Sequence, residues 1–243
     1  MLGIKDVTLR GYARHQLKQD QFTEAAKGTV HWAVEHRQKV IWVSLALTAL
    51  LAIGLTWWFY GSYRENRAAE AFGRAMLTYN AQLQTGEEQP PSGTTFASAT
   101  DRAKAAQTQF SKVADQYAGV RSGKLARYFS GITAVEVGDY NAAERDLKAV
   151  VDSADGDLVS MAKLALANLY RSTGKQAEAT RLYNDLISNP TRAVGKETAQ
   201  LELAALYAPT QPDEARRLYE QVKKDHPQAS AGQIADTRLQ SLK

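Results

Sequence analysis

The chain has 243 residues, no cysteine and a formal net charge of +4. The absence of cysteine excludes disulfides, thiol catalysis, thiolate metal sites and a lipid-modified N-terminal cysteine. Residues 1–60 contain seven Lys or Arg and four Asp or Glu, so they carry +3 of the charge and the rest is nearly neutral. Basic residues nowhere cluster densely with aromatic ones, so nucleic acid is not a predicted partner.

Residues 1–39 form a basic arm whose charge suits the anionic inner leaflet of a membrane. From about Arg14 its apolar residues predict an amphipathic interfacial helix, with one face made of Leu17, Phe22, Ala26 and Val30. The stretch HWAVEH at 31–36 holds two histidines and a glutamate. It lacks the order of a zinc hydrolase motif, which needs two histidines at i and i+4 with Glu beside the first.

Residues 40–60 form an apolar run without a charge. As a helix it is roughly 30 Å long, the thickness of the hydrocarbon core of a bilayer. A buried core helix would carry a polar stripe, for which only Ser44 and Thr48 are available. A cleaved signal peptide would have small residues where the aromatic residues 57–60 stand. Aromatic residues at both ends are typical of a transmembrane helix, which is the prediction for 40–60.

The charges around this run indicate its orientation only weakly. The twenty residues on either side contain three Lys or Arg each. The basic excess of the whole arm favours a cytoplasmic N-terminus, with the long C-terminal part on the other side of the membrane.

Helical periodicity dominates after the apolar run. Residues 61–84 are predicted to continue the helix that leaves the membrane. Residues 85–96 are rich in Gly, Pro, Ser and Thr and are predicted to form a loop. This loop is the only connection long enough to be a candidate domain boundary, which leaves 97–243 as the domain beyond it.

The remaining chain repeats itself every 36 residues. GDYNAAERDLKAVV from Gly138, GKQAEATRLYNDLI from Gly174 and TQPDEARRLYEQVK from Thr210 align. Three sets of apolar residues then fall in register: Ala143, Ala179 and Ala215; Leu147, Tyr183 and Tyr219; Val150, Leu186 and Val222. Phe110 and Val113 belong to a fainter earlier copy, and the preceding segments recur at 37, as in Phe129, Leu166 and Leu203. This period with two helices per unit predicts an all-α solenoid of helical hairpins.

The unit resembles the tetratricopeptide repeat family, whose pattern is met by Leu166, Ala167, Tyr170, Ala179, Tyr183 and Pro190. The next unit offers Leu203, Ala204, Tyr207, Ala215, Tyr219 and Pro227. The sequence departs from the pattern at Lys163, where the family often has Trp, and at Thr133, where an aromatic residue is expected. The resemblance implies three full units, a weaker one at 97–118, and a last helix at 229–243 that caps the stack.

No constellation predicts chemistry, so no catalytic, metal or cofactor site is expected and the chain is not predicted to be an enzyme. DSADGD at 152–157 lacks the glutamate twelve residues from its first aspartate that a calcium loop needs. A helix end, a turn and Asp157 as an N-cap explain it. His226 is the only histidine outside the arm, so a histidine-based catalytic triad is not predicted.

A solenoid presents a concave surface formed by the first helix of each unit. By resemblance to the repeat family, six residues are predicted to face inward and to bind a peptide or protein partner: Lys124, Arg127, Met161, Asn168, Arg171 and Thr198. The alternative is that these are ordinary solvated positions. No small-molecule substrate is predicted.

The whole arrangement resembles the ancillary SecYEG translocon subunit family of bacterial inner membranes. The matching stretches are VEHRQKVIWVSLAL, RAAEAFGRAMLTYNAQL, and QFSKVADQYAGVRSGKLARYFSGITAVEVGDYNAAERDL with the repeats after it. The resemblance implies a single-pass protein with a cytoplasmic N-terminus and a periplasmic domain. Its implied partners are Sec translocon subunits, a periplasmic chaperone and nascent secretory chains. The loop at 85–96 is longer than the family needs.

Two other function classes stay open at this point. One is a membrane-tethered scaffold for envelope assembly or cell division, whose known examples are usually soluble or lipid-anchored. The other is a scaffold that faces the cytoplasm, which requires the reversed topology.

Overall fold

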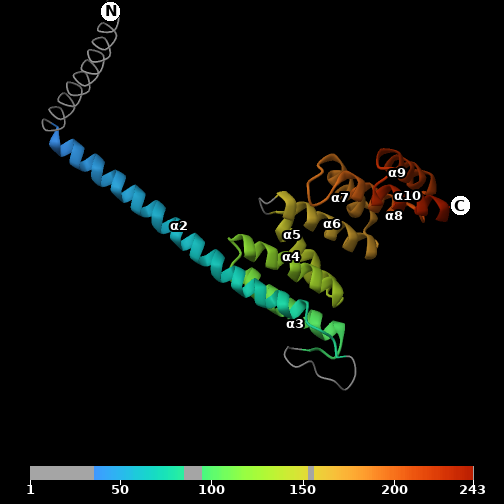
Figure 1. The fold of residues 1–243 in the computed structure, drawn as a ribbon, viewed down its shortest axis with the longest axis horizontal. Coiled ribbons are helices and arrows are strands. Elements are labelled where there is room, and N and C mark those ends of the chain that lie inside the picture. Colours follow the sequence, from blue (N-terminus) through green and yellow to red (C-terminus); the bar gives the residue numbers. More distant parts are fainter. Residues whose placement is uncertain (1–35, 85–94, 153–155, 243) are drawn as a thin grey trace, which may run out of the picture. The chain divides into compact units, whose positions relative to one another are not determined.

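A computed structural model of the chain describes residues 36–84, 95–152 and 156–242. These residues form helices and connections, with one isolated bridge between Leu83 and Phe96 and no strand. The helices, coloured along the chain in Figure 1, are α2 (Arg37–Tyr79), α3 (Ala99–Gln116), α4 (Arg121–Glu136), α5 (Tyr140–Val151), α6 (Gly156–Ser172), α7 (Gln176–Ser188), α8 (Lys196–Tyr207), α9 (Pro212–Asp225) and α10 (Ser230–Ser241). The predicted all-α fold is confirmed. The amphipathic helix predicted in the arm lies outside the described residues.

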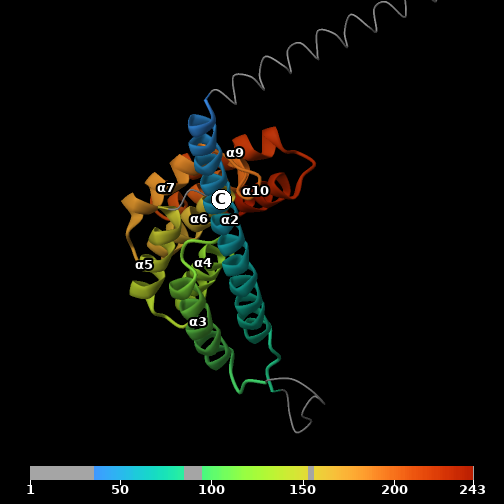
Figure 2. The ribbon, with the colours of Figure 1, turned by 90° about the vertical axis from the view of Figure 1, so that its left-hand side faces the viewer.

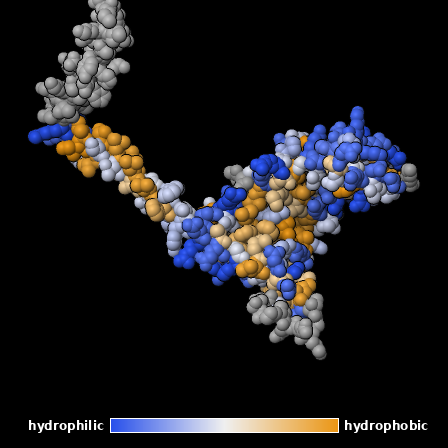
Figure 3. Space-filling view, viewed as in Figure 1, coloured by the Kyte–Doolittle hydropathy of each residue, from blue (hydrophilic) through white to orange (hydrophobic). Residues whose placement is uncertain are grey.

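The described residues fall into two compact units, up to Tyr60 and from Gly61 onward. The first contains the part of α2 that is long and apolar enough to cross a membrane, and none of its most apolar stretch is buried. Figure 3 shows this stretch as a band of apolar colour. The hydroxyls of Thr48 and Thr56 donate to the carbonyls of Ser44 and Ala52, so these polar side chains are satisfied within the helix.

Residues 61–79 of α2 pack against α3 and α4 in the second unit. Phe72 and Tyr79 meet Phe110 and Phe129 with ring centroids 5.6–6.2 Å apart, and Phe110 stacks on Phe129 at 5.3 Å. The carboxylate of Glu65 accepts hydrogen bonds from the backbone and hydroxyl of Ser122, in the first turn of α4. The helix that follows the apolar run is therefore a packed member of the same compact unit as the repeats.

Three helical hairpins follow, α4–α5, α6–α7 and α8–α9, with α10 packed against the last one. In Figure 2, α5 and α7 lie on the left of the second unit and α4 and α6 lie to their right. The repeated alanines Ala143, Ala179 and Ala215 are completely buried, so neighbouring helices approach closely at each of them. Larger buried residues such as Leu147 and Tyr183 fill the space beside them.

The first two hairpins turn at Gly138 and Gly174, 36 residues apart, with φ of 81° and 78°. At both turns the amide after the glycine donates to the carbonyl five residues back, which closes the end of the first helix. The interval from Tyr170 to Ala179 is nine residues, but that from Tyr207 to Ala215 is eight. The α8–α9 turn has no left-handed residue and is one residue shorter than the α6–α7 turn. This difference explains why matching positions of α6 and α8 are 37 residues apart while those of α7 and α9 are 36 apart.

The structure changes one detail of the repeat alignment. Because the turn glycines are 36 residues apart, the buried positions of α4 and α6 also align at 36: Ala126 with Ala162, Ser130 with Leu166, Gly131 with Ala167, and Ala134 with Tyr170. Ala134, and not Thr133, therefore stands where the next unit has its aromatic residue. Thr133 is buried, and its hydroxyl donates to the Phe129 carbonyl.

Candidate functional site

A groove of about 510 Å³ lies between α4 and α6. Its lining residues come from α4, from α6 and from the α7–α8 connection: Tyr128, Ile132, Val135, Glu136, Met161, Leu164, Ala165, Asn168, Leu169, Ser172, Ala193 and Val194. Figure 3 shows apolar colour gathered over α4 and α6 on this side of the unit. Because α4 and α6 are the first helices of two successive hairpins, this groove is the concave surface expected of a solenoid.

Helical periodicity places the apolar lining on one face of each helix. On α4 the contributing positions 128, 132 and 135 recur at intervals of four and three residues. On α6 the apolar positions 161, 164 and 165 share a face in the same way, and the polar Asn168 continues it. These side chains are half-buried, so their apolar atoms remain available to a ligand. Burial raises the pKa of Tyr128, which keeps this phenol neutral in the groove wall.

The α7–α8 connection forms the wall near the start of α6. The hydroxyls of Ser160 and Thr191 are 2.7 Å apart, and Thr191 and Val194 exchange hydrogen bonds of 2.9 and 3.2 Å. Val194 is buried with Leu186 and Ala199 beneath the groove. These contacts hold the connection against α6, and this end of the groove carries no charged side chain.

The other end of the groove is polar and lies where α4 and α6 end. Glu136 is the last residue of α4 and Ser172 the last of α6. The Tyr79 phenol donates a 2.8 Å hydrogen bond to Glu136. Burial, followed by this bond, raises the pKa of Tyr79 to about 12, so the phenol stays neutral.

The six residues predicted to face inward are not brought together. Met161 and Asn168 line the groove, and the Asn168 carbonyl oxygen accepts a 2.6 Å hydrogen bond from Tyr183. Burial raises the pKa of that phenol, so it remains a donor. Lys124 and Thr198 are half-buried on α4 and α8 and do not line this groove.

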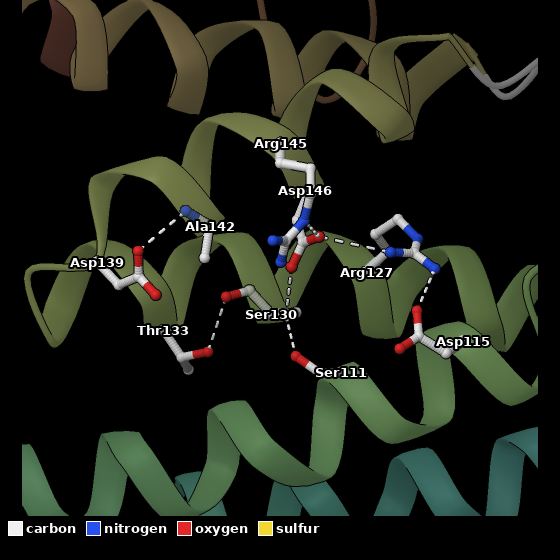
Figure 4. Close-up of polar contacts among 9 residues, drawn as sticks. All are labelled: Ser111, Asp115, Arg127, Ser130, Thr133, Asp139, Ala142, Arg145 and Asp146. Carbon is white, nitrogen blue, oxygen red and sulfur yellow. Dashed lines mark hydrogen bonds and ion pairs between the residues drawn. The ribbon is translucent and has the colours of Figure 1, made fainter.

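The two arginines among the six residues predicted to face inward form ion pairs. Arg171 reaches Glu202 on α8 at 2.9 Å. Arg127 reaches Asp115 at 2.8 Å and Asp146 at 3.4 Å, as Figure 4 shows. The carboxylates balance both cations, so the groove is less basic than the residue types suggest. Partner binding by these side chains stays a prediction.

Asp146 is the centre of a polar network that joins three helices (Figure 4). Its buried carboxylate accepts a 2.6 Å hydrogen bond from Ser130, whose hydroxyl lies 2.7 Å from that of Ser111. Arg145 also reaches Asp146, at 3.3 Å. At the 36-residue spacing Ser130 and Asp146 stand where the next hairpin has Leu166 and Leu182, so a polar pair replaces an apolar one.

Ten of the twelve residues that line the groove were not predicted from the sequence, among them its one charged residue, Glu136. The 36-residue alignment contains a signal for part of it, because Ile132 aligns with Asn168 and Tyr128 with Leu164. No such alignment indicates Glu136, since its place depends on where α4 ends beside α6. Among the described residues, no three His, Cys, Asp or Glu side chains gather in a way that suits a metal ion.

The profile of the tetratricopeptide repeat-like domain family matches residues 30–243, which is most of the chain. The chain belongs to this family. A crystal structure of nearly identical TPR-like repeats from Podospora anserina, assigned to a kinesin light chain, is similar in fold, with a TM-score of 0.55. It is 16% identical, and the match covers 72% of this chain and 84% of that one. No curated protein sequence matches.

Membership accounts for the arrangement of the groove. Tetratricopeptide repeat-like (TPR-like) domains are generally non-catalytic and bind other proteins. The groove of this TPR-like domain has the apolar wall and the few polar groups that a protein segment needs for binding and orientation.

Proposed function

We propose that the protein is a membrane-anchored adaptor that binds segments of client proteins in the groove between α4 and α6. The observation that carries this proposal is the groove itself. It offers about 510 Å³ lined by half-buried apolar side chains in a TPR-like solenoid. Apolar atoms left accessible in a concave surface favour the burial of a partner's apolar side chains.

The proposed anchor is the apolar part of α2. Its side chains are exposed along the whole stretch, from Ile41 at 55% to Trp57 at 80%. Such exposure is costly in water but favourable in lipid, and the backbone groups of a helix are satisfied internally. Trp42 near one end and Trp57 with Trp58 at the other suit the two headgroup regions.

The proposed cellular role is that of an accessory to the Sec translocon in protein export. In this role the N-terminus is cytoplasmic, the TPR-like domain is periplasmic, and the inner membrane of a bacterium holds α2. The partners in this role are Sec translocon subunits, a periplasmic chaperone and nascent secretory chains. This role is supported by the resemblance to the ancillary SecYEG subunit family over nearly the whole chain. The competing role, a scaffold for envelope assembly or cell division, differs in its partners.

Site-specific photo-crosslinking in native membranes tests the proposal. A photoreactive amino acid at Ser172, which is exposed and lines the groove, is expected to capture Sec subunits, a periplasmic chaperone or secretory chains. Ala165→Arg, which fills the groove with a long side chain, is expected to abolish this capture. The same amino acid at the exposed Arg181, on α7, serves as the control. Capture of cytoplasmic proteins, or only of division and cell-wall factors, would contradict the proposed role.

A further inference from the structure

We infer that the groove between α4 and α6 selects client segments in which apolar side chains are joined to a basic residue, with Glu136 receiving the cation. The inference rests on the proposed function and specifies the chemistry of the client. Its basis is the distribution of charge in and around the groove.

Glu136 is the one charged residue among the twelve that line the groove. It is exposed, and it has no ion pair among the described residues. Its hydrogen bond from Tyr79 leaves the negative charge in place, because the phenol is neutral. Arg102 lies near enough for its charge to lower the pKa of Tyr79. Its guanidinium donates to the Ala81 carbonyl and forms no ion pair with Glu136.

The backbone adds to the negative potential at this end. Both α4 and α6 end here, at Glu136 and Ser172. The aligned peptide dipoles of a helix give its C-terminus a partial negative charge, and cations nearby are stabilised. A carboxylate beside two helix C-termini favours a basic group and disfavours an acidic one.

The opposite end of the groove is built for apolar side chains. Met161, Ala193 and Val194 meet there, and none of them offers a side-chain hydrogen bond. Along α6 the lining runs from Met161 to Ser172, which at 1.5 Å per residue is about 16 Å. That length accommodates about five residues of an extended segment. The groove therefore matches a short segment with apolar side chains at one end and Lys or Arg at the other.

The arginines predicted to line the concave face do not oppose this selection. Arg127 is paired with Asp115 and Asp146, and Arg171 with Glu202. Because these cations are balanced by neighbouring carboxylates, Glu136 remains the dominant charge for a ligand in the groove.

Peptide binding to the full-length chain in nanodiscs tests the inference. Three fluorescein-labelled peptides share the apolar stretch Leu-Val-Leu-Ala-Leu and end in two lysines, two glutamines or two glutamates. Fluorescence anisotropy is expected to give at least fivefold tighter binding of the lysine peptide than of the glutamine peptide, with the glutamate peptide weakest. This preference is expected to weaken as salt is added, because the charges meet at an exposed site.

Variants assign the preference to its residue. Glu136→Gln is expected to remove the preference for lysine while the glutamine peptide binds as before, and Glu136→Lys is expected to reverse it. Glu178→Gln makes the same charge change on the exposed surface of α7 and is expected to have no effect. Circular dichroism establishes that each variant is folded.

The outcomes separate this inference from the proposed function. Equal affinity for the three peptides, or a preference that survives Glu136→Gln, overturns the inference. If Ala165→Arg nevertheless abolishes peptide binding, the proposed groove function stands without it. Failure of all three peptides to bind overturns the inference, and failure of cross-linking from Ser172 as well overturns the proposed function.

Discussion

Single carboxylates join successive helices of the solenoid. Glu144 on α5 accepts hydrogen bonds from Lys148 at 2.6 Å, from Lys175 at 2.7 Å and from the Tyr170 phenol at 3.0 Å. Lys175 and Tyr170 belong to the next hairpin, so this cluster connects α5 to α6 and to the turn after it. The hydrogen bonds from Lys148 and then Lys175 lower the pKa of Glu144 from 4.5 to about 2.

Glu144→Gln is expected to destabilise the TPR-like domain by about 1 kcal/mol at neutral pH, because hydrogen bonds to the charged carboxylate are lost. The pKa is lower in the folded state, so the stability from Glu144 is present above pH 4.5 and is lost as the pH falls toward 2. Urea unfolding of both proteins across this range measures the effect. Glu70→Gln, in an exposed pair with Arg74, is the control with little expected change. An equal difference at all pH values would contradict the prediction.

A second prediction at the scale of single residues concerns the polar network around Asp146. Asp146→Ala is expected to cost about 2–3 kcal/mol, because the buried hydroxyl of Ser130 loses its acceptor and Arg127 loses a carboxylate. Asp115→Ala removes the exposed partner of the same arginine and is expected to cost less than about 1 kcal/mol. Chemical unfolding measures the free energy of unfolding of both variants. Similar losses of stability in the two would show that the burial of Asp146 is not decisive.

At the scale of helices and turns, the repeat length is set by how each hairpin turns. Ser98 caps α3 by accepting from the Asp101 amide, and Asp139 caps α5 by accepting from the Ala142 amide. Between helices of a hairpin, Gly138 and Gly174 take the left-handed conformation that a side chain disfavours. The third hairpin uses a turn one residue shorter and has Thr210 at the corresponding place.

Gly138→Ala and Gly174→Ala are each expected to destabilise the domain by about 1 kcal/mol. A Cβ at either position meets no atom within 4 Å, so the cost comes from the backbone conformation and not from a clash. Gly119→Ala is the matched control, because its surroundings are equally open and its φ is not left-handed. Thermal and urea unfolding measure the three variants. A loss at Gly119 as large as at the two turns would refute this account.

At the scale of the whole molecule, an exposed apolar helix and a solenoid belong to one chain. Residues 61–79 of α2 pack into the compact unit through Phe72 and Tyr79, and the apolar part before them remains unpacked within the described residues. In the proposed role, a binding domain that begins directly after an anchor is held at a membrane surface, which raises its local concentration toward clients that appear there.

The proposed topology has a direct test, because the natural chain has no cysteine. Ser172→Cys is expected to react with a membrane-impermeant maleimide added to spheroplasts of a bacterial host, since Ser172 is exposed in the domain proposed to be periplasmic. Gln16→Cys, in the arm proposed to be cytoplasmic, is expected to react only after the membrane is permeabilised. Labelling in the opposite order would favour a scaffold that faces the cytoplasm.

The sequence by itself determined the helical repeats and the candidate span. Both are local in origin: apolar residues at helical spacing mark a helix that must bury one face, and a long uncharged run marks one with no polar face. Several positions that recur through three copies, among them Ala143, Ala179 and Ala215, predicted stacked hairpins, since each position depends only on its own unit and the next.

Only the tertiary structure decided which side chains form the groove and what their charges do. Arg127 and Arg171, which were predicted to face a partner, form ion pairs within the domain because Asp115, Asp146 and Glu202 reach them from neighbouring helices. Glu136 lines the groove because α4 ends beside α6. The physical reason is that a charge acts through what packs within a few ångströms of it, and those neighbours lie far apart in the chain.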